Sequence, residues 1–152
     1  MFLSVLGCSV SQELSAYTAQ EIDYDRQTKE HLSNIQSRIH SFDTISKNAK
    51  PPYDDPILLS NLQDELDQAV QEAQAITDLR CPSTRFDRLC DDFVNLSDVI
   101  LRLRDDITQY YASGLGASER QKVINDMNSM TTFSQNIADD YAQLEAQHGE
   151  IK

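Results

Sequence analysis

The chain of 152 residues is poor in turn-forming residues and in positive charge. It has no tryptophan and only four glycines and four prolines, too few for the many tight turns of a β-sandwich or barrel. Thirteen Lys and Arg against 25 Asp and Glu give a formal net charge of −12. This charge would repel nucleic-acid phosphates and an anionic membrane surface, which argues against both as direct partners. No apolar run approaches the roughly eighteen residues of a membrane span.

The cysteines and histidines offer no complete metal or catalytic set. Cys8, Cys81 and Cys90 contain no Cys-x-x-Cys pair of the kind that zinc sites use. A carboxylate-bridged di-iron bundle requires two Glu-x-x-His motifs, whereas this chain has one, Glu145-Ala146-Gln147-His148. We therefore predict a protein that is not an enzyme, with no catalytic residues, no metal site and no cofactor.

Charged residues are distributed unevenly along the chain. Adjacent helical residues point about 100° apart, so a doubled aspartate rarely chelates one ion, and we predict that the four doubled aspartates lie on solvated faces. Five arginines fall in one segment, where we expect them to meet acidic faces of neighbouring helices. The doubled aspartates are Asp54-Asp55, Asp91-Asp92, Asp105-Asp106 and Asp139-Asp140, and the arginines are Arg80, Arg85, Arg88, Arg102 and Arg104.

What the sequence does have is helical periodicity, clearest over residues 86–110. Apolar side chains recur there at alternating steps of three and four, which keeps them on one side of an α-helix. Weaker stripes predict helices over 11–49, from 56 to about 79, and from about 119 to 148. The central stripe consists of Phe86, Leu89, Phe93, Leu96, Ile100, Leu103, Ile107 and Tyr110.

Three short corners separate these segments. Consecutive prolines end the first helix, and Asp55 followed by Pro56 is typical of an N-cap and first helical position. We expect Ser83 to cap the central helix, Gly114 to end it, and Ser118 to begin a capping box for the last helix. Short corners favour antiparallel neighbours. The prediction is an all-α, up-down-up-down antiparallel four-helix bundle with a long first helix, one domain over residues 11–152, preceded by an apolar segment over residues 1–10.

The first predicted helix has a weak apolar face in its middle, where Glu21, Thr28 and His31 occupy seam positions. This polar stretch is interpreted as a bend, a pocket edge or an oligomer contact. Tyrosines on or beside the stripes are expected to fill the core, and the alternative is that they line a small-molecule pocket. These tyrosines are Tyr17, Tyr24, Tyr110, Tyr111 and Tyr141.

Residues Val5-Leu6-Gly7-Cys8 resemble the lipobox of bacterial lipoproteins, with Cys8 as the lipid-modified residue. Only seven residues precede Cys8 and none is basic, so the resemblance implies a signal peptide that begins upstream of Met1. It also implies a protein of the bacterial cell envelope, periplasmic or at the outer membrane, that touches membrane only through the lipid on Cys8. The alternative is an apolar lead-in that packs on the end of the bundle.

Export would leave Cys81 and Cys90 as the two unmodified cysteines, and an oxidising compartment would allow them to pair. Such a disulfide requires the chain to fold back over two helical turns, so that the Cα atoms come within about 7 Å. The alternative is a buried Cys90 thiol and an ordinary corner role for Cys81.

The predicted function is therefore a non-enzymatic helical bundle of the cell envelope that acts through contacts with an unidentified protein partner, as a monomer or an oligomer. Two alternatives stay open: a bundle that senses or carries a small molecule, and a soluble cytoplasmic helical adaptor.

Overall fold

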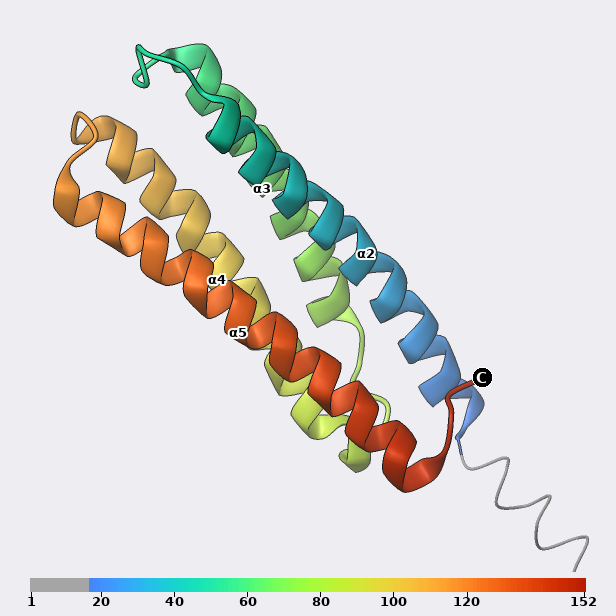
Figure 1. Cartoon of the computed structure of the whole chain (residues 1–152). Helices are drawn as coiled ribbons and strands as arrows, with labels where there is room; N and C mark the ends of the chain where they lie inside the picture. The colour runs from blue at the N-terminus through green and yellow to red at the C-terminus, as the bar shows by residue number, and fades with distance from the viewer. Residues whose placement is uncertain (1–16) are drawn as a thin grey trace, which may run out of the picture.

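The computed structural model describes residues 17–152, of which 84% are helical, and no strand occurs in that range. This confirms the predicted all-α, up-down-up-down four-helix bundle (Figure 1). The central helix begins one residue after the predicted stripe, because Phe86 belongs to a short 3-10 turn. The elements are α2 (Ala19–Asn48), α3 (Pro56–Asp78), the 3-10 helix η1 (Thr84–Phe86), α4 (Asp87–Ala112) and α5 (Ala117–His148).

The helices form two hairpins, α2–α3 and α4–α5, that lie side by side (Figure 1). Close packing joins α2 to α3, α3 to α4 and α4 to α5, whereas α2 and α5 are not among the closely packed pairs of the described residues. The α2–α3 and α4–α5 loops lie at one end of the bundle. The start of α2, the α3–α4 connection and the C-terminus lie at the other, which we call the terminal end (Figure 1).

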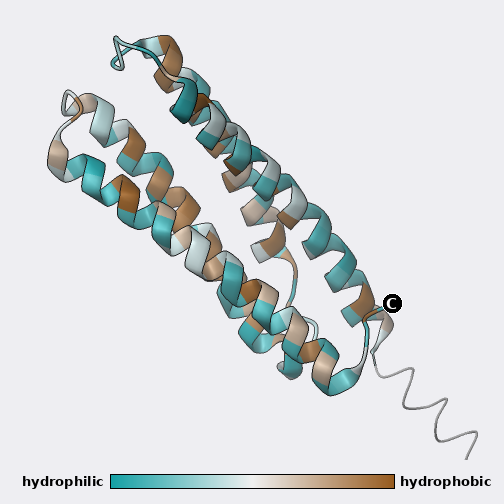
Figure 2. Cartoon of the chain, viewed as in Figure 1, coloured by the Kyte–Doolittle hydropathy of each residue, from teal (hydrophilic) through white to brown (hydrophobic). Residues whose placement is uncertain are grey.

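The core is centred on α4, as its periodicity predicted. The predicted stripe is buried from Phe86 to Ile107, and Tyr110 is half-buried at its end. Of the residues at the edge of the stripe, Val99 is buried but Val94 and Leu101 are exposed. Figure 2 shows apolar and polar residues alternating along every helix, the pattern of amphipathic helices that bury one face.

The first helix is shorter than predicted, because a capping box starts it at Ala19. Thr18 has extended backbone angles, and its hydroxyl accepts a hydrogen bond from the Glu21 amide at 3.1 Å. The Glu21 carboxylate in turn accepts one from the Thr18 amide at 3.1 Å. The Thr-x-x-Glu signal was available in the sequence. At 30 residues α2 is about 45 Å long, close to the 32-residue α5.

The other predicted helix ends are partly right. Asp55 caps α3 by accepting from the Ile57 amide at 2.9 Å, and Gly149, at a φ of 88°, ends α5. Ser83 makes no capping hydrogen bond, because η1 intervenes before α4. Ser118 does not begin a capping box either, because α5 starts two residues earlier than predicted, with Gly116 as its N-cap.

Candidate functional site

A groove of about 490 Å³ lies between α2 and α5, and we call it the α2/α5 groove. Its walls and floor are mainly aliphatic, and polar uncharged side chains predominate among the remaining lining residues. The apolar lining consists of Leu32, Ile35 and Ile39 from α2, Leu96 from α4, and Met127 and Met130 from α5. The polar lining consists of Gln36, His40, Asp43, Asn128, Thr131 and Ser134.

The groove exists because its two walls are held by different neighbours. α2 packs on α3, and α5 packs on α4, so the apolar stripes of α2 and α5 are left without a common partner here. Leu32, Ile39 and Met127 are consequently only half-buried, although they contact the core. Two of the three methionines of the chain lie in this lining, and their flexible side chains adapt to irregular apolar partners.

At the terminal end, by contrast, α2 and α5 are joined by polar contacts. The Tyr17 hydroxyl lies within hydrogen-bonding distance of two carbonyl oxygens, Leu144 at 3.1 Å and Gly149 at 2.9 Å. The Thr28 and Tyr141 hydroxyls lie 2.6 Å apart.

The buried Glu21 explains part of the polar stretch in α2. Its side chain is almost fully buried, and Arg85 donates to both carboxylate oxygens, from Nη2 to Oε1 at 2.9 Å and from Nε to Oε2. The Ser83 hydroxyl adds a third donor at 3.2 Å. The Arg85 hydrogen bonds hold the pKa of Glu21 at about 2, despite the opposing effect of burial. Glu21 is therefore a structural anion with no free acid–base role near neutral pH.

Cys81 and Cys90 are joined in the structure by a disulfide, with Cα atoms 6.1 Å apart. The bond ties the α3–α4 corner to the first turn of α4. The Tyr24 hydroxyl lies 3.3 Å from Cys90 Sγ, and the hydroxyl must be the donor because a disulfide sulfur carries no hydrogen. Cys8 lies outside the described residues, so its predicted lipidation stays a prediction.

The tyrosines fall into two groups and do not line one pocket. Tyr17 and Tyr24 pack edge-on against Phe86, with ring centroids 6.3 and 5.9 Å away, and Tyr141 packs edge-on against Phe93 of α4. Burial raises the pKa of Tyr24 to about 12 and also raises the pKa of Tyr141. Tyr110 and Tyr111 lie at the opposite end of α4. The expected core-filling role describes Tyr24 and Tyr141 well.

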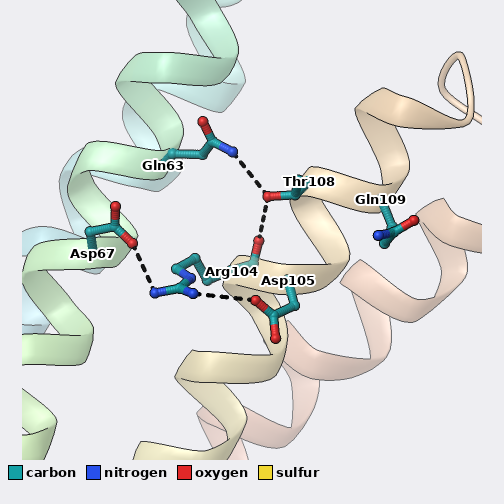
Figure 3. Close-up of a pocket in the computed structure, with 6 residues that line it drawn as sticks. All are labelled: Gln63, Asp67, Arg104, Asp105, Thr108 and Gln109. Carbon is teal, nitrogen blue, oxygen red and sulfur yellow. Dashed lines mark hydrogen bonds and ion pairs between the residues drawn. The ribbon is translucent and has the colours of Figure 1, made fainter.

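A second hollow, of about 550 Å³, lies between α3 and α4 (Figure 3). Most of its polar side chains bind one another. Arg104 contacts Asp67 at 3.3 Å and Asp105 at 3.6 Å, and Gln63 donates to the Thr108 hydroxyl at 2.9 Å (Figure 3). A ligand would have to break these contacts, so this hollow is a weaker candidate than the α2/α5 groove.

Histidines and acidic residues form no cluster of three that suits a metal within residues 17–152. His31 Nδ1 lies 2.6 Å from a carboxylate oxygen of Glu72 on α3, and His40 lines the groove. His148 of the Glu-x-x-His motif packs edge-on against Tyr17. None of the helices in the same range combines the length and hydrophobicity of a membrane span.

The expectation that the five arginines meet acidic faces of neighbouring helices is confirmed for four of them but not for Arg80. Four ion pairs join α4 and the corner before it to other helices: Arg85–Glu21, Arg88–Asp140, Arg102–Asp126 and Arg104–Asp67.

The expectation that every doubled aspartate lies on a solvated face is wrong for Asp140. Its side chain is buried between α4 and α5, with only 4% of the residue exposed, because it lies on the face of α5 that packs on α4. Sequence reasoning missed Glu21, Asp25, Asp126 and Asp140 as buried charges. A usable signal was the repeated Arg-x-x-x-Asp at 88–92 and 102–106.

No family model, curated protein or solved structure matches this chain. Its function is therefore inferred from the geometry and chemistry of the α2/α5 groove and from the sequence.

Proposed function

We propose that this chain is a non-enzymatic binding bundle of the bacterial cell envelope, tethered by a lipid on Cys8, whose α2/α5 groove docks an amphipathic helix of a partner protein. The observation that carries the docking role is the apolar groove itself, in a bundle whose buried charges mostly lie against charged neighbours. The tether is supported by the resemblance of Val5-Leu6-Gly7-Cys8 to a lipobox.

The lining of the groove favours a helix as its occupant. Leu32, Ile35 and Ile39 on one wall follow the three-four spacing of a helical stripe, and Met127, Met130 and Ser134 follow it on the other. Two such stripes side by side present the holes into which the knobs of a further helix insert. Helix-in-groove recognition uses the same apolar positions on the peptide, at i, i+3, i+4 and i+7.

The polar residues at the rim of the groove indicate which residue types should flank the apolar face of that helix. Gln36, Asn128 and Thr131 offer neutral hydrogen-bonding groups beside the apolar floor, and Asp43 lies at one end. The net charge of −12 attracts a basic partner over longer distances and speeds its association. We infer an occupant with Leu, Ile or Met on its apolar face and Lys or Arg on its flanks.

The groove and the tether would occupy different parts of the molecule. The described residues begin with Tyr17, at the terminal end, and the groove begins at Leu32, 13 residues or about 20 Å beyond the first residue of α2. A lipid on Cys8 would therefore attach the end of the bundle where α2 and α5 are joined, leaving the groove free for a partner.

The docking role is tested by placing a photo-crosslinking amino acid at Ile39 in the groove and, as a control, at the exposed Leu101 of α4. We expect a partner that crosslinks at Ile39 only, through an amphipathic helical segment. A synthetic peptide of that segment should bind the purified protein and lose at least tenfold in affinity with Ile39→Asp but not with Leu101→Asp. Equal affinity for both variants would refute docking in the groove.

The tether is tested separately, with the gene expressed from its natural start codon. Cys8→Ser should release the protein from washed membranes, because two or more acyl chains anchor stably at about 0.8 kcal/mol per buried methylene. Ser9→Ala is the matched control and should stay bound. A wild-type protein found wholly in the soluble fraction would favour the cytoplasmic adaptor.

The volume of the groove also fits the second candidate, a small-molecule carrier or sensor, since ligand sites usually span about 300–1,000 Å³. A compound that raises the melting temperature of the wild type but not of Ile39→Asp would favour this role, because ligand bound to the native state stabilises it.

A further inference from the structure

A charged arrangement occurs twice across the α4–α5 interface. In each copy an arginine of α4 contacts a buried aspartate of α5, and an aspartate one turn further along α4 faces the same carboxyl group. Corresponding residues are fourteen positions apart on each helix, nearly four turns, so they share a face about 21 Å apart. The two copies are Arg88, Asp92 and Asp140 near the terminal end, and Arg102, Asp106 and Asp126 nearer the loops.

Both α5 carboxyl groups are buried with at least one oxygen that receives no hydrogen bond. Asp140 and Asp126 are 4% and 6% exposed, and neither oxygen of Asp140 nor Oδ2 of Asp126 has a hydrogen-bond partner among the described residues. Arg88 Nε lies 2.8 Å from Asp140 Oδ1, close enough for an ion pair but without hydrogen-bond geometry. A buried acceptor without a donor is costly, and a proton on one carboxyl of each pair would supply the missing donor.

The charges around each pair favour such a proton. Burial and the facing Asp92 of α4 raise the pKa of Asp140 to about 6, with Asp139 adding to the effect and Arg88 opposing it. Arg85, which is paired with Glu21, lines the same small hollow as Asp140.

At the second copy the same two causes act. Burial and the facing Asp106 of α4 raise the pKa of Asp126, and Arg102, at 3.2 Å from Oδ1, opposes them. Like charges facing each other in a buried site cannot both ionise without cost.

The two pairs bracket the part of α5 that forms the groove. Asp126 and Asp140 lie on either side of the segment 127–134, which supplies the α5 wall. The corresponding positions halfway between the pairs are apolar, the buried Val99 on α4 and the half-buried Phe133 on α5. The groove-lining segment is thus seated on α4 through an apolar middle with a carboxyl pair at each end.

We propose that the two carboxyl pairs form a proton-operated clamp, in which one proton held by each pair seats α5 on α4 and its loss loosens the groove-lining segment. The proton comes from solvent and is shared between the two facing carboxyl groups. Regulation of partner binding by this clamp rests on the proposed function of the groove, whereas the clamp itself does not.

Native-state amide hydrogen exchange of segment 127–134, corrected for intrinsic rates, tests the clamp between pH 7 and pH 5. A pKa of about 6 against an ordinary 3.8 predicts about tenfold greater protection at pH 5 from Asp140 alone. The Asp126→Asn/Asp140→Asn variant supplies a donor at every pH and should lose this rise. Asp91→Asn/Asp105→Asn removes the same charge from exposed neighbours and should keep it.

Three outcomes would overturn the clamp. The increase in protection at pH 5 could persist in the Asp126→Asn/Asp140→Asn variant, it could be lost equally in the control variant, or an increase of the same size could occur in α3. Carboxyl ¹³C titration of the wild type gives an independent reading, since two aspartates should titrate clearly above the rest. Affinity for the crosslinked peptide is measured at both pH values. If the peptide binds equally at both pH values while the increase in protection of α5 at pH 5 is still observed, regulation of the groove is refuted. If no peptide binds at either pH, the proposed function is refuted instead.

Discussion

Along α2, a single helical turn separates two ways of facing α5. Thr28 meets the hydroxyl of Tyr141 directly, whereas Leu32, four residues on, faces the apolar α2/α5 groove. The polar contacts of the terminal end have defined partners and distances, and they hold α2 and α5 together there. The aliphatic lining of the groove has no such partner, so it can accept one. Fixed polar contacts and adaptable apolar surface are thus divided between two parts of the same helix pair.

Among substitutions in the terminal end and in the groove, we expect Arg85→Ala, at the terminal end, to cause the largest loss of stability. It leaves Glu21 buried without its main donor and should cost about 3–5 kcal/mol in free energy of unfolding. Arg104→Ala is the matched control, because its pair with Asp67 is largely exposed and should cost less than about 1 kcal/mol. Chemical denaturation measures both, and similar midpoints would show that the terminal end is not held by this pair.

Acid should weaken the terminal end in a predictable direction. The folded-state pKa of Glu21, about 2, lies below its ordinary 4.5, so its stabilisation is present above pH 4.5 and lost as the pH falls toward 2. The loss should be on the order of 3 kcal/mol, and Glu21→Gln should remove the dependence.

The pKa of Asp140 is shifted in the opposite direction from that of Glu21, so its effect on stability has the opposite pH dependence. Its pKa is raised, so its protonated form stabilises fully below pH 3.8 and this contribution disappears as the pH rises through about 6. Taken together, these two sites should place the stability maximum near about pH 4, between the ordinary pKa values of 3.8 and 4.5. A maximum above pH 7 would mean that one of these two sites has been assigned the wrong environment.

The disulfide should contribute less than the Glu21–Arg85 pair. Cys81 and Cys90 are nine residues apart, and closing so short a loop stabilises by about 2–3 kcal/mol in the chain-entropy model. Reductant should lower the melting temperature of the wild type accordingly and leave Cys81→Ser/Cys90→Ser unchanged. A wild type that is insensitive to reductant while its thiols become reactive would show that the bond adds no stability.

The smallest effect is expected in the groove. Ile39→Asp places a carboxylate on a half-buried surface with access to water and should cost about 1 kcal/mol or less. Denaturation of this variant beside Arg85→Ala gives the comparison directly. A cost equal to that of Arg85→Ala would mean that α2 and α5 are packed together along the groove.

The helices and their order could be predicted because each stripe and corner is local in sequence. Glu21 looked like an interruption of the first stripe, and its partner Arg85 lies 64 residues away, a distance over which periodicity gives no information. The groove could not be predicted either, because the stripe residues Ile35 and Ile39 look the same whether or not a helix covers them. Which aspartates of α4 and α5 face each other depends on how the two helices are aligned, which the sequence does not state. The repeat of Arg-x-x-x-Asp after fourteen residues was the one available indication.

The most direct test of the groove uses methyl NMR of the wild type with dissolved oxygen as an apolar relaxation agent. Met127 and Ile39 line the groove, whereas Ile76 and Ile100 lie in the closed core and serve as internal controls. We expect strong oxygen-induced relaxation of the Met127 and Ile39 methyl groups and much weaker effects on Ile76 and Ile100. Met127 and Ile39 methyl groups as well shielded as that of Ile100 would mean that α2 and α5 close against each other in solution, and that no groove exists to receive a partner.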